Sequence, residues 1–341
     1  MLAALIYNSH AGQIVIRREL EAVVDYLRYN GWIVSVQETR MPLEATQLAR
    51  QAARRGAQVV VAVGGDGTVN EVVSGLVGTD AALGVLPVGT TNVWALQMRI
   101  PALDPMRPGT RLVRWVADLE ERFESPFPLN YHRTVLLDAA RVLVQGQTVA
   151  VDLGEVAGRY FLLWAGIGLD AAATESVSPE EKKALGSWAY VIPVLDTIRE
   201  YACADVTLTI DGKVIKSSTP LIVVSNIQLY GAAFPIGAKA CVNDAKLDVC
   251  IFKGEGLFTF VRHALKVLSR QHLHDPEIEY YQCHEIVVES TRPLPVHADD
   301  EPFTKTPVTI RTVPKALRVI VPQDVPKGLF REQVLDPCHP G

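Results

Sequence analysis

The sequence is poor in cysteine, and its few cysteines form no recognisable framework. It has 341 residues with five cysteines, an odd number, and no Cys-x-x-Cys spacing. A disulfide scaffold or a zinc site needs paired or closely grouped cysteines. We therefore expect free thiols and a reducing, cytoplasmic environment. The five are Cys203, Cys241, Cys250, Cys283 and Cys338.

Net positive charge is lacking as well. The formal charge is −5 at pH 7. A protein that binds nucleic acid usually carries a basic face that neutralises phosphates. The composition therefore argues against nucleic acid as the partner, although it leaves room for a local basic patch.

The sequence also lacks a long apolar run. One long stretch without a charged residue, 81–98, contains Gly84, Pro87, Gly89 and several polar residues. A bilayer-spanning helix would not gather so many helix breakers. The first seven residues carry no basic segment and are followed by Asn8, so they predict a strand and not a signal peptide.

Internal repeats and low-complexity tracts are missing, and what remains has the composition of a folded protein. Hydrophobic residues make up 48% and charged residues 21% of the chain. This balance is typical of globular domains. A chain of 341 residues is long enough for two domains, each with its own core.

The first hundred residues predict alternating strands and helices. Short apolar runs at 3–7, 32–37, 59–63 and 83–86 alternate with helical patterns at 14–29, 43–55 and 68–76. The β-branched run at 59–63 suits a strand that is buried on both faces. This order predicts an open parallel sheet with ligands at the carboxyl ends of its strands. We assign this domain to residues 1–132, including a Pro-rich insertion at 102–131.

After residue 133 strands dominate. Strands are expected at 135–144, 148–152, 160–165, 308–312 and 317–321, among others, with helices at 180–201 and 257–270. The Asp211-Gly212 pair between alternating segments signals a two-residue hairpin. We expect a mostly antiparallel β domain over 133–315, and a tail of about 316–341 that returns to the first domain.

The most informative motif follows the buried strand at 59–63. It reads Gly64-Gly65-Asp66-Gly67-Thr68-Val69-Asn70-Glu71. Glycines after a strand allow backbone N–H groups to approach a phosphate, and the next helix offers its positive end to the same anion. Asp66 adds a carboxylate that could hold Mg²⁺ or accept a proton. The alternative is a tight turn capped by Asp66 and Thr68.

Two further blocks add to this motif. Pro87-Val88-Gly89-Thr90-Thr91-Asn92 again follows a strand and either caps the next helix or supplies more donors to a triphosphate. His297-Ala298-Asp299-Asp300-Glu301 places three carboxylates together late in the chain. Taken alone, such an acidic turn is usually only solvated.

Together these blocks resemble the diacylglycerol kinase catalytic family, which includes soluble bacterial lipid kinases and the sphingosine and ceramide kinases. Asn8–Gly12 resembles the family's opening Asn-Pro-x-x-Gly element. Val151–Gly154 and Phe161–Asp170 resemble its entry into the β domain, and Gly186, Tyr190 and Ser225-Asn226 follow in family order. The resemblance covers residues 2 to about 321.

The resemblance implies an N-terminal parallel α/β sheet of the NAD kinase and diacylglycerol kinase type, with a C-terminal β-sandwich. It implies an ATP-dependent lipid kinase with ATP and Mg²⁺, in which Glu301 is the general base and Asp66 and Asp299 are further catalytic carboxylates. It implies a structural Mg²⁺ at Asp244 with the carbonyls of Cys241 and Lys246. The implied nucleotide contacts are Asn8, Thr39, Gly64, Gly65, Asp66, Gly67, Thr68, Asn70, Glu71, Gly89, Thr90 and Asn92.

The chain departs from the family pattern at three turns. Val93 follows Asn92 where the family often has Asp, Asp300 replaces the glycine of Asp-Gly-Glu, and Ala245 replaces a glycine after Asp244. The last two residues tolerate positive φ less well than glycine does. An NAD kinase-like enzyme and a catalytically inactive nucleotide- or lipid-binding protein therefore stay open as alternatives, and the sequence names no particular lipid.

As partners we expect a lipid substrate at a membrane surface, reached by peripheral contact from the cytoplasm, and we leave a homodimer open. We also expect the nucleotide loop and Asp299–Glu301 to face a shared cleft. The segment 257–274 combines apolar residues with Arg262, Lys266 and Arg270. It predicts either a helix at an anionic membrane interface or an ordinary helix packed on the β domain.

Overall fold

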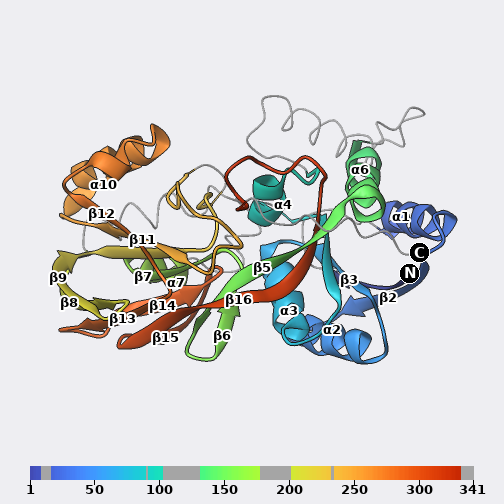
Figure 1. Cartoon of the computed structure of the whole chain (residues 1–341), viewed down its shortest axis with the longest axis horizontal. Helices are drawn as coiled ribbons and strands as arrows, with labels where there is room; N and C mark the ends of the chain where they lie inside the picture. Colours follow the sequence, from blue (N-terminus) through green and yellow to red (C-terminus); the bar gives the residue numbers. More distant parts are fainter. Residues whose placement is uncertain (9–16, 90, 103–130, 177–200, 232–233, 332–341) are drawn as a thin grey trace. The chain divides into compact units, whose positions relative to one another are not determined.

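The structure is a computed structural model of residues 1–341. It describes the chain except residues 9–16, 90, 103–130, 177–200, 232–233 and 332–341 (Figure 1). The chain forms two compact units. The first contains residues 1–149, 318–325 and 335–341, and the second contains 150–317 and 326–334.

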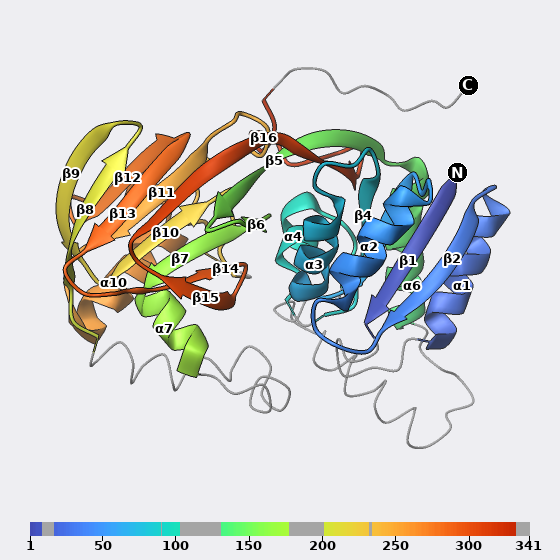
Figure 2. The ribbon, with the colours of Figure 1, turned by 90° about the horizontal axis from the view of Figure 1, so that it is seen from below.

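The first unit is built on a parallel sheet with the order β2-β1-β3-β4. Helices α2 and α3 cover one face of it, and α1 and α6 cover the other (Figure 2). The strands are β1 (Leu2–Asn8), β2 (Ile33–Thr39), β3 (Val59–Gly64) and β4 (Ala82–Pro87). The helices are α1 (Arg17–Tyr29), α2 (Glu44–Arg54), α3 (Asp66–Leu76), α4 (Val93–Met98) and α6 (Tyr131–Gln145).

The two central strands read as continuous apolar runs because helices cover both of their faces. Every residue of β3 and of β4 is buried. Helix α2 buries Ala45, Ala49 and Ala52, which recur at helical spacing, and it packs against α3. The apolar pattern therefore accounts for the layer order of this unit.

The strand expected at 135–144 is wrong, because this segment lies in helix α6. Its buried residues are Leu136, Ala139, Ala140 and Leu143, at helical spacing. Helix α6 packs on α1 and on β4, so it belongs to the first unit. A run rich in valine and leucine is compatible with both states, and here tertiary packing selects the helix.

The second unit is antiparallel. One sheet has the order β12-β11-β10-β7-β14-β15, and a second set of strands has the order β16-β13-β8-β9. The strands of the unit are β5 (Gln147–Val156), β6 (Arg159–Phe161), β7 (Trp164–Gly168), β8 (Ala204–Ile210), β9 (Lys213–Thr219), β10 (Leu221–Ser225), β11 (Leu247–Phe252), β12 (Ile278–Cys283), β13 (Glu285–Ser290), β14 (Pro295–Ala298), β15 (Glu301–Lys305) and β16 (Val308–Val321).

The core of the second unit joins its two sets of strands. Leu208 and Ile286 come from one set, and Ile222 and Ile251 come from the other, all in one buried cluster. Alternating burial along β8 is typical of strands with one face on a core. Helices α7 (Leu169–Ser176) and α10 (Gly256–Leu268) and the short η2 (His272–His274) complete this unit.

Strand β16 is one continuous strand, although two shorter ones at 308–312 and 317–321 were expected. Its first part pairs antiparallel with β13, from Val308 to Arg311. Its last part pairs parallel with β4, through Arg318 and Val319. The chain therefore re-enters the first unit along this strand. The predicted fold class, a parallel α/β sheet plus an antiparallel β domain, is confirmed.

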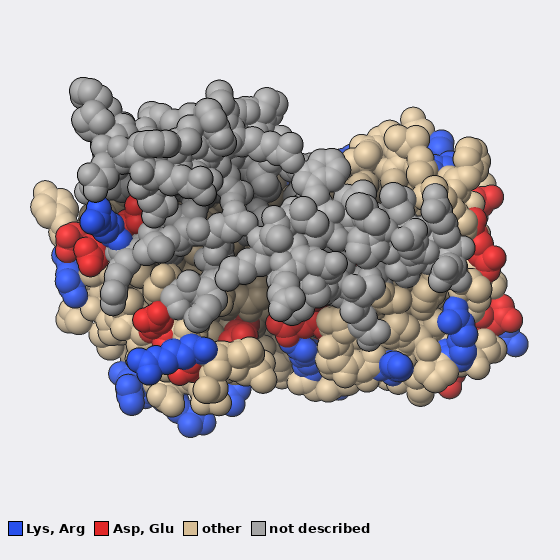
Figure 3. Space-filling view, turned by 180° about the vertical axis from the view of Figure 1, so that it is seen from behind, with Lys and Arg blue, Asp and Glu red and all other residues tan. Residues whose placement is uncertain are grey.

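Within the described residues, no helix is both long and apolar enough to cross a lipid bilayer. On the face drawn in Figure 3, Lys and Arg side chains lie in small groups among Asp and Glu side chains. Several expectations fall outside the described residues. These are the 9–12 part of the opening element, Thr90, the body of the 102–131 insertion, most of the 180–201 helix with Gly186 and Tyr190, and the last ten residues of the tail.

Candidate active site

The four parallel strands of the first unit end at one edge of their sheet. In the pairing register, Asn8 lies beside Thr39, and Gly64 lies beside Pro87. The sequence-predicted nucleotide residues follow these ends directly. The edge is the position at which open α/β sheets bind ligands, because loops and helix N-termini converge there.

Two glycine-bearing loops pack against each other at this edge. The loop after β3 contains Gly65, and the loop after β4 contains Gly89. A Cβ on Gly65 would lie 3.3 Å from Gly89 Cα, and a Cβ on Gly89 would lie 2.9 Å from Asn92 Oδ1 and still closer to Gly65 Cα. The backbone N–H of Val88 donates to Gly64 O at 3.1 Å. Only residues without a side chain allow this close approach.

Asp66 joins the two loops. Its carboxylate accepts the backbone N–H of Val93 at 3.0 Å and that of Trp94 at 3.4 Å. These are the first two residues of α4, whose N-cap Asn92 makes no side-chain cap hydrogen bond. Asp66 therefore caps α4, 27 residues further along the chain. From the sequence, this carboxylate was expected either to hold Mg²⁺ or accept a proton, or to cap the turn after the strand.

Asn92 closes the second loop on itself. Its Oδ1 accepts the N–H of Gly89 at 3.0 Å, and its Nδ2 donates to Gly89 O at 2.7 Å. Asn92 is buried and has a positive φ of 54°. This side chain holds the loop in shape, and asparagine tolerates the left-handed conformation better than most residues.

Helix α3 begins directly after Gly64 and Gly65, so its N-terminus lies at the same edge. The first N–H groups of any helix have no intrahelical acceptor and attract anions. Thr68 is buried, and its Oγ1 lies 3.4 Å from Asn8 Nδ2. Asn70 is also buried, and its Oδ1 has no hydrogen-bond partner within the described part of the chain. Buried oxygens of this kind usually bind a partner.

Two predicted nucleotide contacts are engaged within the protein. Glu71 Oε2 accepts the N–H of Ala45 at 3.1 Å, and Glu71 O accepts the hydroxyl of Thr46 at 2.9 Å. Glu71 thus holds the first turn of α2. Thr39 is buried, and its hydroxyl donates to Tyr7 O at 3.5 Å.

In the second unit, the three-carboxylate block forms the β14–β15 hairpin. Asp299 and Asp300 are its two turn residues, with φ values of 47° and 64°. Asp299 is buried, and its carboxylate accepts the N–H groups of Leu162, Leu163 and Trp164 at 2.8–3.1 Å. Burial raises the pKa of Asp299 to about 7, while these three N–H donors act in the opposite direction. The geometry makes Asp299 an anchor for the hairpin.

Glu301, the predicted base, is the first residue after this turn. It forms an ion pair with Arg159, which sequence reasoning missed. The guanidinium of Arg159 also lies 5.1 Å from the centre of the Phe303 ring. The Glu301 side chain is 41% exposed, so it can still reach a substrate.

A buried histidine–carboxylate pair lies beside this hairpin. His297 is fully buried on β14, and its Nε2 contacts Asp170 Oδ2. Burial lowers the pKa of His297, but Asp170 outweighs it, so the net pKa shift is upward. The pKa of Asp170 is shifted down, because His297 outweighs burial. His297 stands in the block that the sequence analysis singled out, but only the fold reveals its partner.

The predicted metal residues lie in a turn stabilised by Asp152. Asp152 Oδ2 accepts the N–H of Ala245 at 2.6 Å, and Asp152 Oδ1 accepts that of Lys315 at 2.7 Å. Ala245 has a φ of 62°, in the left-handed region that a glycine would favour. The Asp244 side chain is only 4% exposed, and Arg331 Nη2 lies 3.7 Å from it.

Three carboxylates lie close to one another at this turn, and the pKa values of two of them are raised. Burial raises the pKa of Asp152, and Asp244 raises it further. Burial likewise raises the pKa of Asp248 to about 7, again with a contribution from Asp244. Across the described residues, no three His, Cys, Asp or Glu side chains are grouped to hold a metal ion. A cation here would therefore rely on backbone carbonyls such as those of Cys241 and Lys246.

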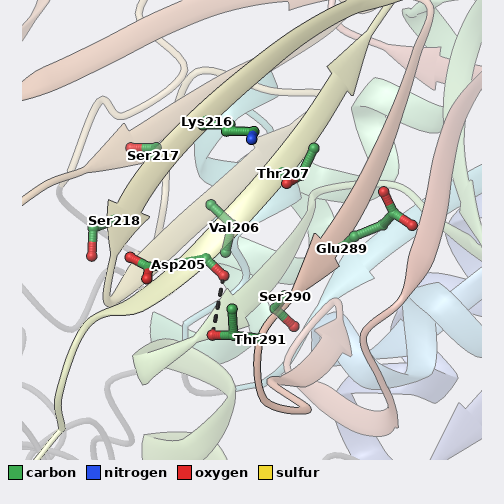
Figure 4. Close-up of a pocket in the computed structure, with 9 residues that line it drawn as sticks. All are labelled: Asp205, Val206, Thr207, Lys216, Ser217, Ser218, Glu289, Ser290 and Thr291. Carbon is green, nitrogen blue, oxygen red and sulfur yellow. Dashed lines mark hydrogen bonds between the residues drawn. The ribbon is translucent and has the colours of Figure 1, made fainter.

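A separate surface hollow contains none of these residues. It has a volume of about 670 Å³ and lies over β8, β9 and β13 (Figure 4). Thr291 Oγ1 donates to Asp205 O at 3.4 Å along its floor. The hollow is lined mainly by Ser, Thr and charged residues, whereas small-molecule sites are mostly apolar with a few polar groups. We assign it no function.

The fold defines the class of protein: a parallel α/β domain with two paired glycine-bearing loops, followed by an antiparallel β-sandwich domain. Residues 2–117 match the diacylglycerol kinase catalytic domain, and residues 164–321 match the YegS C-terminal NAD kinase beta sandwich-like domain. These two matches lie in family order along the chain, and the predicted resemblance to the diacylglycerol kinase catalytic family is confirmed. At the level of that family it is a kinase.

Individual relatives extend over nearly the whole chain. A diacylglycerol kinase of Bacillus subtilis (strain 168) is 28% identical over 324 residues, covering 94% of this chain and 97% of its own. One from Staphylococcus carnosus (strain TM300) is 24% identical over 336 residues, covering 95% and 96%.

Solved structures share the fold. A crystal structure of a diacylglycerol kinase from Bacillus anthracis str. Sterne has a TM-score of 0.67 at 20% identity and covers 95% of this chain and 97% of that one. Another structure from that strain has a TM-score of 0.72 at 22% identity, with coverages of 95% and 98%.

Proposed function

We propose that the protein is an ATP-dependent lipid kinase that transfers the γ-phosphoryl group of ATP to a hydroxyl of a diacylglycerol-like lipid. The observation that carries the proposal is the Asp66 bridge. It fixes two glycine-bearing loops side by side at the carboxyl edge of the sheet. The helix N-terminus at this edge is suited to phosphate groups.

The first unit would supply the nucleotide site. In this proposal the phosphates lie over the N-terminus of α3, against the backbone of Gly64–Gly67, with Thr68 and Asn70 beside them. The unpartnered Oδ1 of Asn70 supports a polar ligand at this position. The remaining proposed contacts are Asn8, Thr39, Glu71, Gly89, Thr90 and Asn92.

The second unit would supply the base. Glu301 would accept the proton of the lipid hydroxyl as its oxygen attacks the γ-phosphorus, and ADP would leave. The ion pair with Arg159 would orient the carboxylate of Glu301. Asp299 would act as a positioning residue, because its oxygens are occupied by three backbone N–H groups.

Magnesium fits the turn around Asp244. The side chain of Asp244 is nearly buried, and its carboxylate oxygens are of the kind that Mg²⁺ prefers. Asp244 and the carbonyls of Cys241 and Lys246 would hold it. When bound there, the ion would stabilise the turn electrostatically. A second Mg²⁺ would accompany ATP as part of the substrate.

The lipid assignment comes from the relatives, which are named diacylglycerol kinases. The enzyme would act at a membrane surface from the cytoplasm and belong to phospholipid metabolism. An NAD kinase-like activity on the same loop would need a dinucleotide in place of a lipid. An inactive protein would bind nucleotide or lipid without turnover.

The test is a labelled-ATP assay with Mg²⁺ and a panel of acceptors: diacylglycerol, monoacylglycerol, a sphingoid base, ceramide, phosphatidylglycerol and NAD. We expect a labelled lipid product and none from NAD. A labelled NADP product would establish the NAD kinase alternative. ATP binding without any product would support an inactive binding protein. Asp66→Ala serves as the negative control.

A further inference from the structure

Helix α10 packs on the second unit through one narrow face. Its buried residues are His263 and Val267. The His263 ring lies 5.6 Å from the Phe252 ring on β11, and its Nε2 lies 2.8 Å from Lys253 O. These contacts orient the helix and leave its opposite face to solvent.

That opposite face carries a row of large apolar side chains, the α10 apolar row. Its members are Phe258, Val261, Leu265 and Leu268, which are 84%, 47%, 62% and 50% exposed. Their spacing of three, four and three residues places them on one side of the helix. Single exposed apolar residues are common on proteins, but a contiguous row usually marks an interaction surface.

The charge on α10 has one sign. The helix contains no Asp or Glu, whereas the whole chain has a net charge of −5. Lys266 Nζ donates to the neutral Gln271 at 3.1 Å, and Arg270 just after the helix is exposed. Arg262 differs from them, because it forms ion pairs with Asp275 and Glu277 and so anchors the helix. Lys266 lies in the last turn of α10 and Arg270 just beyond it, so both basic residues stand at the C-terminal end of the helix.

We propose that the α10 apolar row docks on an anionic lipid surface, with its side chains at the acyl boundary and Lys266 and Arg270 against the headgroups. Apolar and basic groups arranged in this way are typical of interfacial helices. This docking surface rests on the proposed function, since a lipid kinase must reach a substrate held in a bilayer.

A second protein is a poorer match to this surface. Four side chains on one 13-residue helix expose roughly a few hundred Å². A stable protein interface buries about 800 Å² on each partner. A bilayer imposes no such minimum area, because each apolar side chain inserts on its own.

The experiment compares vesicle binding of two double variants in the full chain, without nucleotide. Phe258→Glu with Leu265→Glu places two carboxylates in the apolar row. Tyr29→Glu with Val214→Glu is the matched control, since these residues are 90% and 59% exposed elsewhere. Co-sedimentation uses vesicles of phosphatidylcholine with phosphatidylglycerol. We expect the first variant to bind at least about tenfold more weakly, which corresponds to about 1.4 kcal/mol, and the control to bind like the wild type.

A second pair of measurements tests the two basic residues, Lys266 and Arg270. Lys266→Gln with Arg270→Gln should weaken binding to the vesicles that contain phosphatidylglycerol and leave binding to pure phosphatidylcholine unchanged. Arg262 stays intact in this variant because of its ion pairs. Equal loss on both kinds of vesicle would overturn the electrostatic part of the proposal.

The outcomes separate the docking surface from the proposed function. Wild-type vesicle binding that the Glu variant loses, without phosphorylation of any lipid, would refute the kinase assignment and leave the docking surface standing. Turnover of a water-dispersed short-chain diacylglycerol should survive the Glu substitutions. The proposal is overturned if the wild type does not bind vesicles or if the Glu variant binds them as strongly as the control. It is equally overturned if the substitutions only lower the melting temperature or only abolish self-association.

Discussion

Asp66 is the residue whose removal should separate stability from catalysis most sharply. Asp66→Ala deletes the acceptor of two backbone N–H groups, at 3.0 and 3.4 Å, at the start of α4. This helix has six residues, and its own N-cap, Asn92, makes no cap hydrogen bond. The two glycine loops would then lose the side chain that ties them together.

The expected cost in stability is modest. Loss of a helix cap costs about 0.5–2 kcal/mol, and the melting temperature of a unit this large falls by roughly 2–4 °C per kcal/mol. The expected cost in turnover is larger, because a displacement of about 1 Å in a positioning group can lower a rate about 100-fold. We expect ATP affinity to fall and phosphorylation to drop by at least that factor.

Two further variants sharpen the comparison. Asp66→Asn retains one acceptor oxygen, but its amide N–H₂ faces the second backbone N–H, so it should recover only part of the stability. The matched control is Asp211→Ala, which removes a carboxylate that accepts the N–H groups of His284 and Glu285, each at 2.9 Å. This control should melt earlier and turn over ATP normally.

The measurements are thermal unfolding by circular dichroism, ATP binding by calorimetry and turnover of labelled ATP. If Asp66→Ala behaves like Asp211→Ala, with a lower melting temperature and normal turnover, the loop bridge is only a structural cap. The reasoning that places the phosphates at this edge would then be refuted.

Three other expectations follow from the same contacts. Gly89→Ala would bring a Cβ within 2.9 Å of Asn92 Oδ1, so calorimetry should show weaker ATP binding, and unchanged affinity would contradict the loop packing. Glu301→Gln should lower the rate by about 10²–10⁴-fold at similar ATP affinity. If it stays active while Asp299→Asn is dead, Asp299 is the base. Burial raises the pKa of Asp248 to about 7. Between about pH 4 and pH 7 the folded state therefore holds a proton that the unfolded state has lost. The free energy of unfolding should fall as pH rises through this range. The expected fall is on the order of 1 kcal/mol of unfolding free energy per pH unit. Denaturant titrations at pH 5, 6 and 7 should show a smaller fall in Asp248→Asn. An equal slope in both proteins would exclude Asp248 as the cause.

The sequence was sufficient to predict the elements whose hydrophobic pattern fits only one kind of secondary structure. The buried run of β3, the glycines that follow it and the amphipathic α2 were all predictable from local physics. The 135–144 segment was not, because valine and leucine suit strands as well as helices. Its contacts with α1 and β4 decided the outcome.

The candidate site was predictable in its residue types more than in its contacts. Glycines and small polar residues after parallel strands indicate a phosphate site without further information. The partners of the acidic residues are distant along the chain. Asp66 accepts a hydrogen bond from a residue 27 positions away, and Asp299 accepts one from a residue 137 positions away. Glu301 forms an ion pair with Arg159, 142 positions away. No local pattern encodes such pairs.

The sequence by itself determined the two fold classes and the resemblance to one family, and it predicted a phosphate site at the β3–α3 loop, because these depend on periodicity and on local backbone freedom. Only the tertiary structure decided which face of α10 is exposed and what each carboxylate does. Asp299 became an anchor because folding surrounds it with three N–H donors, whereas Glu301 stayed partly open to solvent. A carboxylate's role depends on its burial and its neighbours, and both exist only after distant segments meet.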